Sequence, residues 1–91
     1  MSDKRISFQV DGEVQGVNFR SYTQKQARSI GITGFVRNTS DGTVQGEAQG
    51  SADQLKDFVQ HLNTGPPAAS VSGVMHNDIS PKSGESSFHV K

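Results

Sequence analysis

The chain has 91 residues, the length of one small domain, so we expect a single domain over residues 1–91 with about the first four residues flexible. Nine basic and nine acidic residues give a formal net charge of zero, which argues against a surface built for nucleic acid or anionic membranes. The absence of cysteine excludes disulfides, thiolate metal sites and a cysteine nucleophile, and it agrees with a cytoplasmic location. The N-terminal residues contain no long apolar run, so we expect neither a signal peptide nor a membrane span.

The first third of the chain predicts a strand, a glycine-containing loop and a helix. Apolar and polar residues alternate over residues 5–11, which predicts a half-buried strand whose outward face carries Arg5. From Phe19 to Ile30 the apolar residues take helical spacing. Gly31 then suits the left-handed conformation with which many helices end.

A β-hairpin follows the first helix. Residues 32–39 and 43–49 predict two strands, and the Asp41-Gly42 pair between them is a strong signal for a tight turn. In the second of these strands, the residues that share one face are small or apolar: Val44, Gly46 and Ala48.

The next segment predicts a second amphipathic helix. Ser51 and Gln54 form the pattern of a capping box at its start, and Thr64-Gly65-Pro66-Pro67 ends it. The apolar stripe of this helix consists of Leu55, Phe58, Val59 and Leu62.

Two strands complete the chain. A strand near residues 69–77 carries Val71 and Val74, whose odd spacing indicates a bulge or a local twist, and Phe88 with Val90 forms a short closing strand. The predicted order is therefore β-α-β-β-α-β plus a short C-terminal strand. This order is typical of the α+β, ferredoxin-like split β-α-β sandwich, with two helices on one face of an antiparallel sheet.

The loop over residues 12–20, Gly-Glu-Val-Gln-Gly-Val-Asn-Phe-Arg, has the parts of an anion site. Gly12 and Gly16 permit backbone angles that let successive N–H groups point at one anion. The start of the helix adds free N–H groups and a positive dipole end, and the guanidinium of Arg20 can hold two phosphate oxygens. An ordinary strand-to-helix loop with a solvated arginine is the alternative interpretation.

Asn38 is the second candidate, near the end of a strand and just before the tight turn. Its amide can donate and accept at once, which suits the orientation of a water molecule. The alternative is that Asn38 only serves the turn.

Together the two segments closely resemble the acylphosphatase family. The first reads Gly12-Glu13-Val14-Gln15-Gly16-Val17-Asn18-Phe19-Arg20, and the second reads Gly34-Phe35-Val36-Arg37-Asn38-Thr39-Ser40-Asp41-Gly42-Thr43-Val44. The resemblance covers nearly the whole chain. Phe35, where tryptophan is common in the family, departs from the pattern without touching the expected site.

This resemblance implies hydrolysis of acyl phosphates to a carboxylate and inorganic phosphate, in the cytoplasm, by a monomer that needs no metal or organic cofactor. It implies that water oriented by Asn38 attacks directly and that Arg20 clamps the phosphoryl group. The loop that would cradle this group with backbone N–H groups consists of Gln15, Gly16, Val17, Asn18, Phe19 and Arg20. The partners it implies are a small acyl phosphate and inorganic phosphate as product and inhibitor, with no nucleic acid and no membrane.

Two other functions stay open at this point. One is a non-catalytic anion-binding or regulatory module on the same fold, which would not need a water-orienting amide. The other is an RNA-binding module, which the non-aromatic outward faces of the first and third strands disfavour.

Among other candidate groups, Ser21 is interpreted as a helix-start residue and Asp41 as a turn residue. The three histidines, His61, His76 and His89, lie at no metal-ligand spacing.

Overall fold

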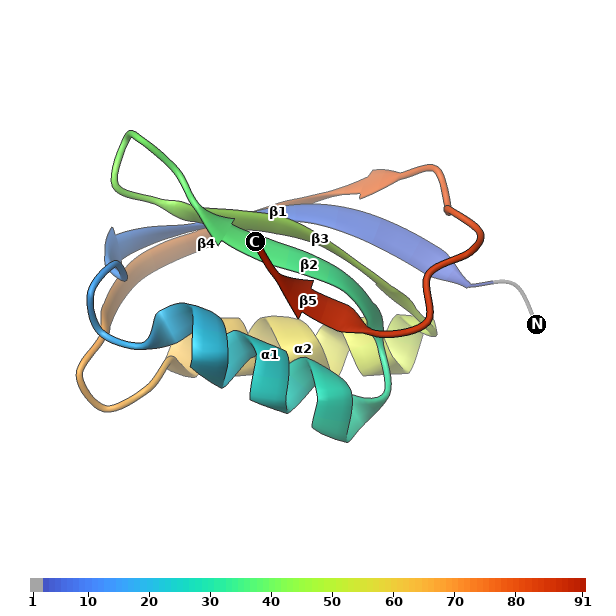
Figure 1. Cartoon of the computed structure of the whole chain (residues 1–91), viewed down its shortest axis with the longest axis horizontal. Coiled ribbons are helices and arrows are strands. Elements are labelled where there is room, and N and C mark those ends of the chain that lie inside the picture. Colours follow the sequence, from blue (N-terminus) through green and yellow to red (C-terminus); the bar gives the residue numbers. More distant parts are fainter. Residues whose placement is uncertain (1–2) are drawn as a thin grey trace.

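The computed structural model describes residues 3–91, which form five strands and two helices (Figure 1). The flexibility expected for the first four residues falls partly on residues 1–2, which lie outside this range, and the first strand begins at Lys4. In chain order the elements are β1 (Lys4–Glu13), α1 (Phe19–Ile30), β2 (Thr33–Asn38), β3 (Val44–Gly50), α2 (Ala52–Thr64), β4 (Ser70–Ile79) and β5 (Phe88–Val90). The predicted order of elements and the ferredoxin-like α+β class are confirmed.

The five strands form one sheet in the order β4-β1-β3-β2-β5. The β1–β3, β1–β4 and β2–β3 pairs are antiparallel, but β5 runs parallel to β2. The predicted antiparallel sheet is therefore confirmed for β1 to β4, whereas the short strand β5 makes the whole sheet mixed. The chain leaves β4 at one edge, crosses the end of the sheet and returns along the opposite edge, and this path makes β5 parallel to its neighbour (Figure 1).

Both helices cover one face of the sheet, and the core lies between them and the strands (Figure 1). Three aromatic rings connect its layers. Phe58 on α2 packs against Phe8 on β1, with ring centroids 5.3 Å apart, and against Phe88 on β5, with centroids 5.8 Å apart. Phe88 thereby fixes the short last strand to the core, since its side chain is fully buried.

The ends of the helices follow from local chemistry. Gly31 takes a φ of 95° after α1, and its N–H donates to the carbonyl of Ala27. At the start of α2, the hydroxyl of Ser51 accepts from the N–H of Gln54, while the Gln54 side chain accepts from the N–H of Ser51. The predicted capping box is confirmed, and α1 has the bounds that the sequence predicted.

The predicted irregularity in β4 is a bulge opposite β1. Asp11 pairs with Gly73 and Gly12 pairs with Val71, so Ser72 is the extra residue. Because an extra residue restores the alternation of faces, Val71 and Val74 both pack against the core despite their odd spacing.

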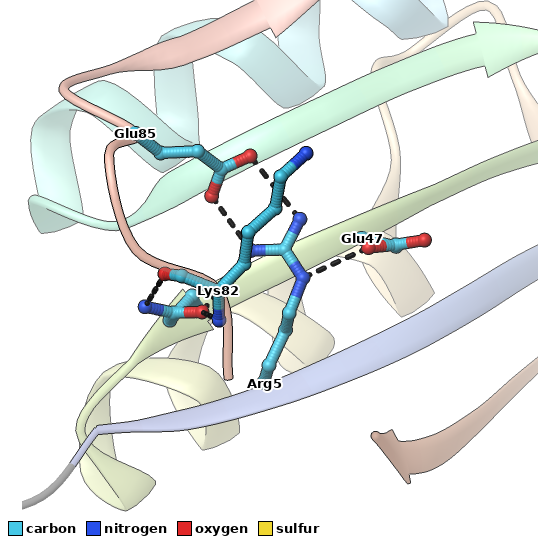
Figure 2. A network of polar contacts seen from close by, with 5 residues as sticks. Arg5, Glu47, Lys82 and Glu85 are labelled. Atoms are coloured by element: carbon cyan, nitrogen blue, oxygen red, sulfur yellow. Dashed lines mark hydrogen bonds and ion pairs between the residues drawn. The ribbon is translucent and has the colours of Figure 1, made fainter. Parts of the chain in front are cut away.

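Arg5 differs from its predicted exposure, because only 2% of its surface is accessible. It does lie on the outward face of β1, but carboxylates cover its guanidinium there (Figure 2). Glu85 accepts two hydrogen bonds, at 2.6 and 3.1 Å, and Glu47 accepts one at 2.8 Å. The hydrogen bond to Glu85 is the main cause that raises the pKa of Arg5. The loop that brings Glu85 here lies 80 residues along the chain, beyond the reach of a local pattern.

Candidate active site

The loop after β1 reaches the start of α1 through two left-handed residues. Gly16 has a φ of 74°, and Asn18 has a φ of 65° and a ψ of 25°. Within the described chain, the Asn18 side chain makes no capping hydrogen bond, and the first turn of α1 contains no acidic residue. The first N–H groups of a helix have no partner inside it, so this end presents donors and a positive dipole end.

A pocket of about 240 Å³ opens at this helix end. It is lined by Val14, Gly16, Asn18, Phe19, Arg20, Ser21, Asn38 and Val90. A Cβ added at Gly16 would meet no atom within 4 Å, so the loop leaves open space beside its backbone. Five of the predicted site residues thus surround one pocket: Gly16, Asn18, Phe19, Arg20 and Asn38.

Arg20 lies in the first turn of α1 and is half-buried. Its Nη1 donates to the main-chain carbonyl of Lys91, 3.1 Å away. Its other N–H groups make no hydrogen bond to residues 3–91, so they can donate to an anion in the pocket. Lys91, the residue that follows β5, therefore supports the guanidinium from one side.

Asn38 is the last residue of β2 and comes to the pocket from the sheet. Its Oδ1 is buried, and no group of the described residues donates a hydrogen bond to it. A buried acceptor without a donor costs about 1–3 kcal/mol, so its retention favours a functional partner. A water molecule in the pocket is chemically suited to that role.

Gln15 belongs to the predicted cradle, but its side chain points to the hairpin turn and does not line the pocket. Its Nε2 donates to the carbonyls of Thr39 and Thr43, at 2.7 and 2.9 Å. These contacts tie the loop to the turn that directly follows Asn38. Val17 likewise belongs to the loop without lining the pocket.

Asp41 stabilises the turn itself. Its carboxylate accepts from the hydroxyls of Thr39 and Thr43 and from the N–H of Thr43. The hydroxyl of Thr39, followed by that of Thr43, lowers the pKa of Asp41. Its carboxylate is thus engaged within the turn, which agrees with the interpretation of Asp41 as a turn residue.

The sequence reasoning missed Val14, Val90 and the carbonyl of Lys91. Val14 is the first buried residue after β1, and its position in the loop over residues 12–20 could have identified it as a pocket residue. Val90 lines the pocket and the carbonyl of Lys91 reaches Arg20 because β5 lies parallel beside β2, and no local sequence pattern predicts that pairing. Ser21 lines the pocket and is exposed, at the helix-start position predicted for it.

The histidines lie apart from this site. His61 faces Asp57 on α2 at 3.7 Å, and His89 contacts Ser87 beside β5. Among residues 3–91, no three metal-ligating side chains are grouped closely enough to hold an ion. None of the helices in that range has both the length and the apolar character needed to cross a bilayer.

The fold and the pocket define a class: a small α+β domain with a pocket between a helix N-terminus and the sheet. The family model for acylphosphatase matches residues 6–90. An acylphosphatase of Salinibacter ruber is 44% identical over 73 residues, which cover 80% of this chain and 77% of that protein. One from Thermotoga petrophila is 39% identical over 97% of both chains. The solved acylphosphatase from Coxiella burnetii superposes with a TM-score of 0.92 at 37% identity, over 98% of this chain and 93% of that one.

The chain belongs to the acylphosphatase family. Its activity is accordingly that of a hydrolase acting on acyl phosphates, and the comparisons do not favour the alternative of a non-catalytic anion-binding module.

Proposed function

We propose that the pocket at the start of α1 is the catalytic site, with Arg20 and Asn38 as its catalytic residues. The N–H groups over residues 15–20 hold the phosphoryl oxygens, and the guanidinium of Arg20 clamps the same group. Asn38 orients the attacking water through its side-chain amide. Water attacks phosphorus, the bond from phosphorus to the carboxylate oxygen breaks, and the water protons pass to phosphate and solvent.

One observation carries this proposal: Arg20, the uncapped helix end and the buried Oδ1 of Asn38 meet at one pocket. A carboxylate is a good leaving group, so the reaction needs no strong general acid. Phosphoryl transfer asks mainly for positioning and stabilisation of charge, and backbone donors with one guanidinium supply both. No phosphorylated enzyme is required on this route.

The test is hydrolysis of benzoyl phosphate in ¹⁸O-labelled water, first over many turnovers and then with enzyme in excess over substrate. Attack at phosphorus places the label in inorganic phosphate and leaves benzoate unlabelled. Direct attack also predicts that acid quenching during a single turnover traps no phosphorylated protein. Label in benzoate, or a trapped phosphoprotein, would contradict the proposal.

The ligands proposed for the site are a small acyl phosphate and inorganic phosphate, the latter as product and competitive inhibitor. A pocket that holds the phosphoryl group of the substrate must also hold the product. We further propose that the protein is a cytoplasmic monomer, a location with which its lack of cysteine agrees. Light scattering at micromolar concentration should give the mass of one chain.

A further inference from the structure

The connection between β4 and β5, residues 80–87, lacks regular structure and is largely exposed, yet two polar contacts fix it to the sheet (Figure 2). Arg5 donates two hydrogen bonds to Glu85, at 2.6 and 3.1 Å. The side chain of Gln49 pairs with the main chain of Lys82, accepting from its N–H and donating to its carbonyl, each at 2.8 Å.

The charges in the first contact are well shielded. The side chain of Arg5 is 1% exposed and that of Glu85 is 15% exposed. A paired arginine and carboxylate in such surroundings form short, strongly directional hydrogen bonds. Loss of Arg5 leaves the Glu85 carboxylate without this partner, whereas loss of Glu85 leaves Arg5 paired with Glu47 alone among the acidic residues of the described chain, so the contact holds the connection against the sheet.

β5 is a weakly specified strand. It has three residues, lies at the edge of the sheet and, within the part of the chain that the structure describes, pairs with β2 alone. Phe88 anchors its start in the core, and the carbonyl of Phe88 accepts from Gln24 and Arg28 on α1. Beyond Phe88 the strand is exposed. The position of its C-terminal end is therefore set by its pairing register with β2 rather than by burial of side chains.

That end reaches the candidate active site. Val90 lines the pocket, the N–H of Lys91 donates to the carbonyl of Val36 at 2.8 Å, and the carbonyl of Lys91 accepts from Arg20. Lys91 lies only six residues after Glu85. The connection at Glu85 and the carbonyl that supports the Arg20 guanidinium therefore belong to one short segment, with the buried Phe88 between them.

We propose that the Arg5–Glu85 ion pair is a positioning element for Arg20, acting through β5 and the carbonyl of Lys91. The inference rests on the proposed role of Arg20 as the clamp for the phosphoryl group. Arg5 and Glu85 touch no substrate. They determine how well the guanidinium of Arg20 is oriented before the substrate binds. This orientation affects the affinity for the phosphoryl group more than the rate of the chemical step.

The experiment compares Glu85→Ala and Arg5→Gln with Ser83→Ala, a control in the same exposed connection. For each variant, KM and kcat for benzoyl phosphate and the inhibition constant of inorganic phosphate are measured at a temperature where circular dichroism shows it folded. We expect KM and the inhibition constant to rise about three- to tenfold in both ion-pair variants, with kcat changed less than about twofold. Glu85→Gln, which keeps an acceptor for Arg5, should lie between Glu85→Ala and the parent.

A double-mutant cycle with Arg20→Lys separates an effect that acts through Arg20 from a purely structural role of the ion pair. Arg20→Lys retains a cation for phosphate. If the pair acts through Arg20, adding Glu85→Ala to Arg20→Lys should weaken phosphate inhibition further by less than twofold. An undiminished effect in that background, or unchanged phosphate inhibition in folded Glu85→Ala, would overturn the inference. If Arg20→Lys itself leaves phosphate inhibition and KM unchanged, the proposed role of Arg20 fails and the inference fails with it.

Discussion

Arg20 is the charged residue among those that line the pocket, and its planar guanidinium can donate two hydrogen bonds to one phosphate. We predict that Arg20→Gln lowers kcat/KM for benzoyl phosphate about 10²–10³-fold and weakens inhibition by phosphate. Arg37→Gln is the matched control, because Arg37 is exposed on the opposite face of the sheet and does not line this pocket. Near-normal kcat/KM in Arg20→Gln would contradict the assigned role.

Asn38 is expected to act on the water rather than on the phosphoryl group. We predict that Asn38→Ala lowers kcat about 10²–10³-fold while the inhibition constant of phosphate changes little. Steady-state kinetics with phosphate as competitor measure both quantities. Asn77→Ala, at an exposed position on β4, should leave both unchanged. Lost phosphate affinity with unchanged kcat would mean that Asn38 binds the anion instead.

At the scale of elements, the capping box of α2 is separate from the site. We predict that Ser51→Ala lowers the free energy of unfolding by about 1 kcal/mol, because the N–H of Gln54 loses its acceptor. Urea denaturation followed by circular dichroism measures this loss, with Ser86→Ala as an exposed control. Activity per folded molecule should not change. A loss of activity in folded Ser51→Ala would show that α2 does influence the pocket.

The hairpin turn is the element that joins the two predicted motifs. Gln15 donates to the carbonyls of Thr39 and Thr43, so the loop before α1 is tied to the turn that follows Asn38. The sequence predicted the loop and the turn separately. It did not predict this contact, because a glutamine in a loop carries no local signal of its partners.

At the scale of the whole molecule, the carboxylate of Glu85 connects the C-terminal segment to β1. The hydrogen bond from Arg5 lowers the pKa of Glu85 below its usual range. A carboxyl group whose pKa is lower in the folded state stabilises the fold above its unfolded pKa, near 4.3, and this contribution is lost as the pH falls through the folded pKa. The free energy of unfolding should therefore decrease as the pH falls below about 5.

We predict that this acid dependence is smaller in Glu85→Gln, because its amide does not titrate. Unfolding in urea at a series of pH values from about 6 to 3 measures the slope for each protein. Glu13→Gln, at an exposed position that forms no ion pair with residues 3–91, provides the comparison. Equal slopes in the parent and Glu85→Gln would contradict the link between Glu85 and acid stability.

The predictable parts of the molecule are those set by neighbouring residues. The bounds of α1, the capping box at Ser51 and the bulge in β4 depend on local spacing, and the structure confirms them. The burial of Arg5 and the parallel pairing of β5 depend on a connection more than 70 residues after Arg5. The β1 pattern placed Arg5 on the correct face but could not show what covers that face.

The central claim is that the main-chain amides before α1 and the guanidinium of Arg20 hold a phosphoryl group beside Asn38. A crystal structure of the protein soaked in phosphate tests it most directly. We predict one phosphate with oxygens about 2.7–3.2 Å from N–H groups of residues 15–20 and from Arg20, with a water bridging it to Asn38. Phosphate bound elsewhere, with Arg20 turned into solvent and Asn38 out of reach, would contradict the account.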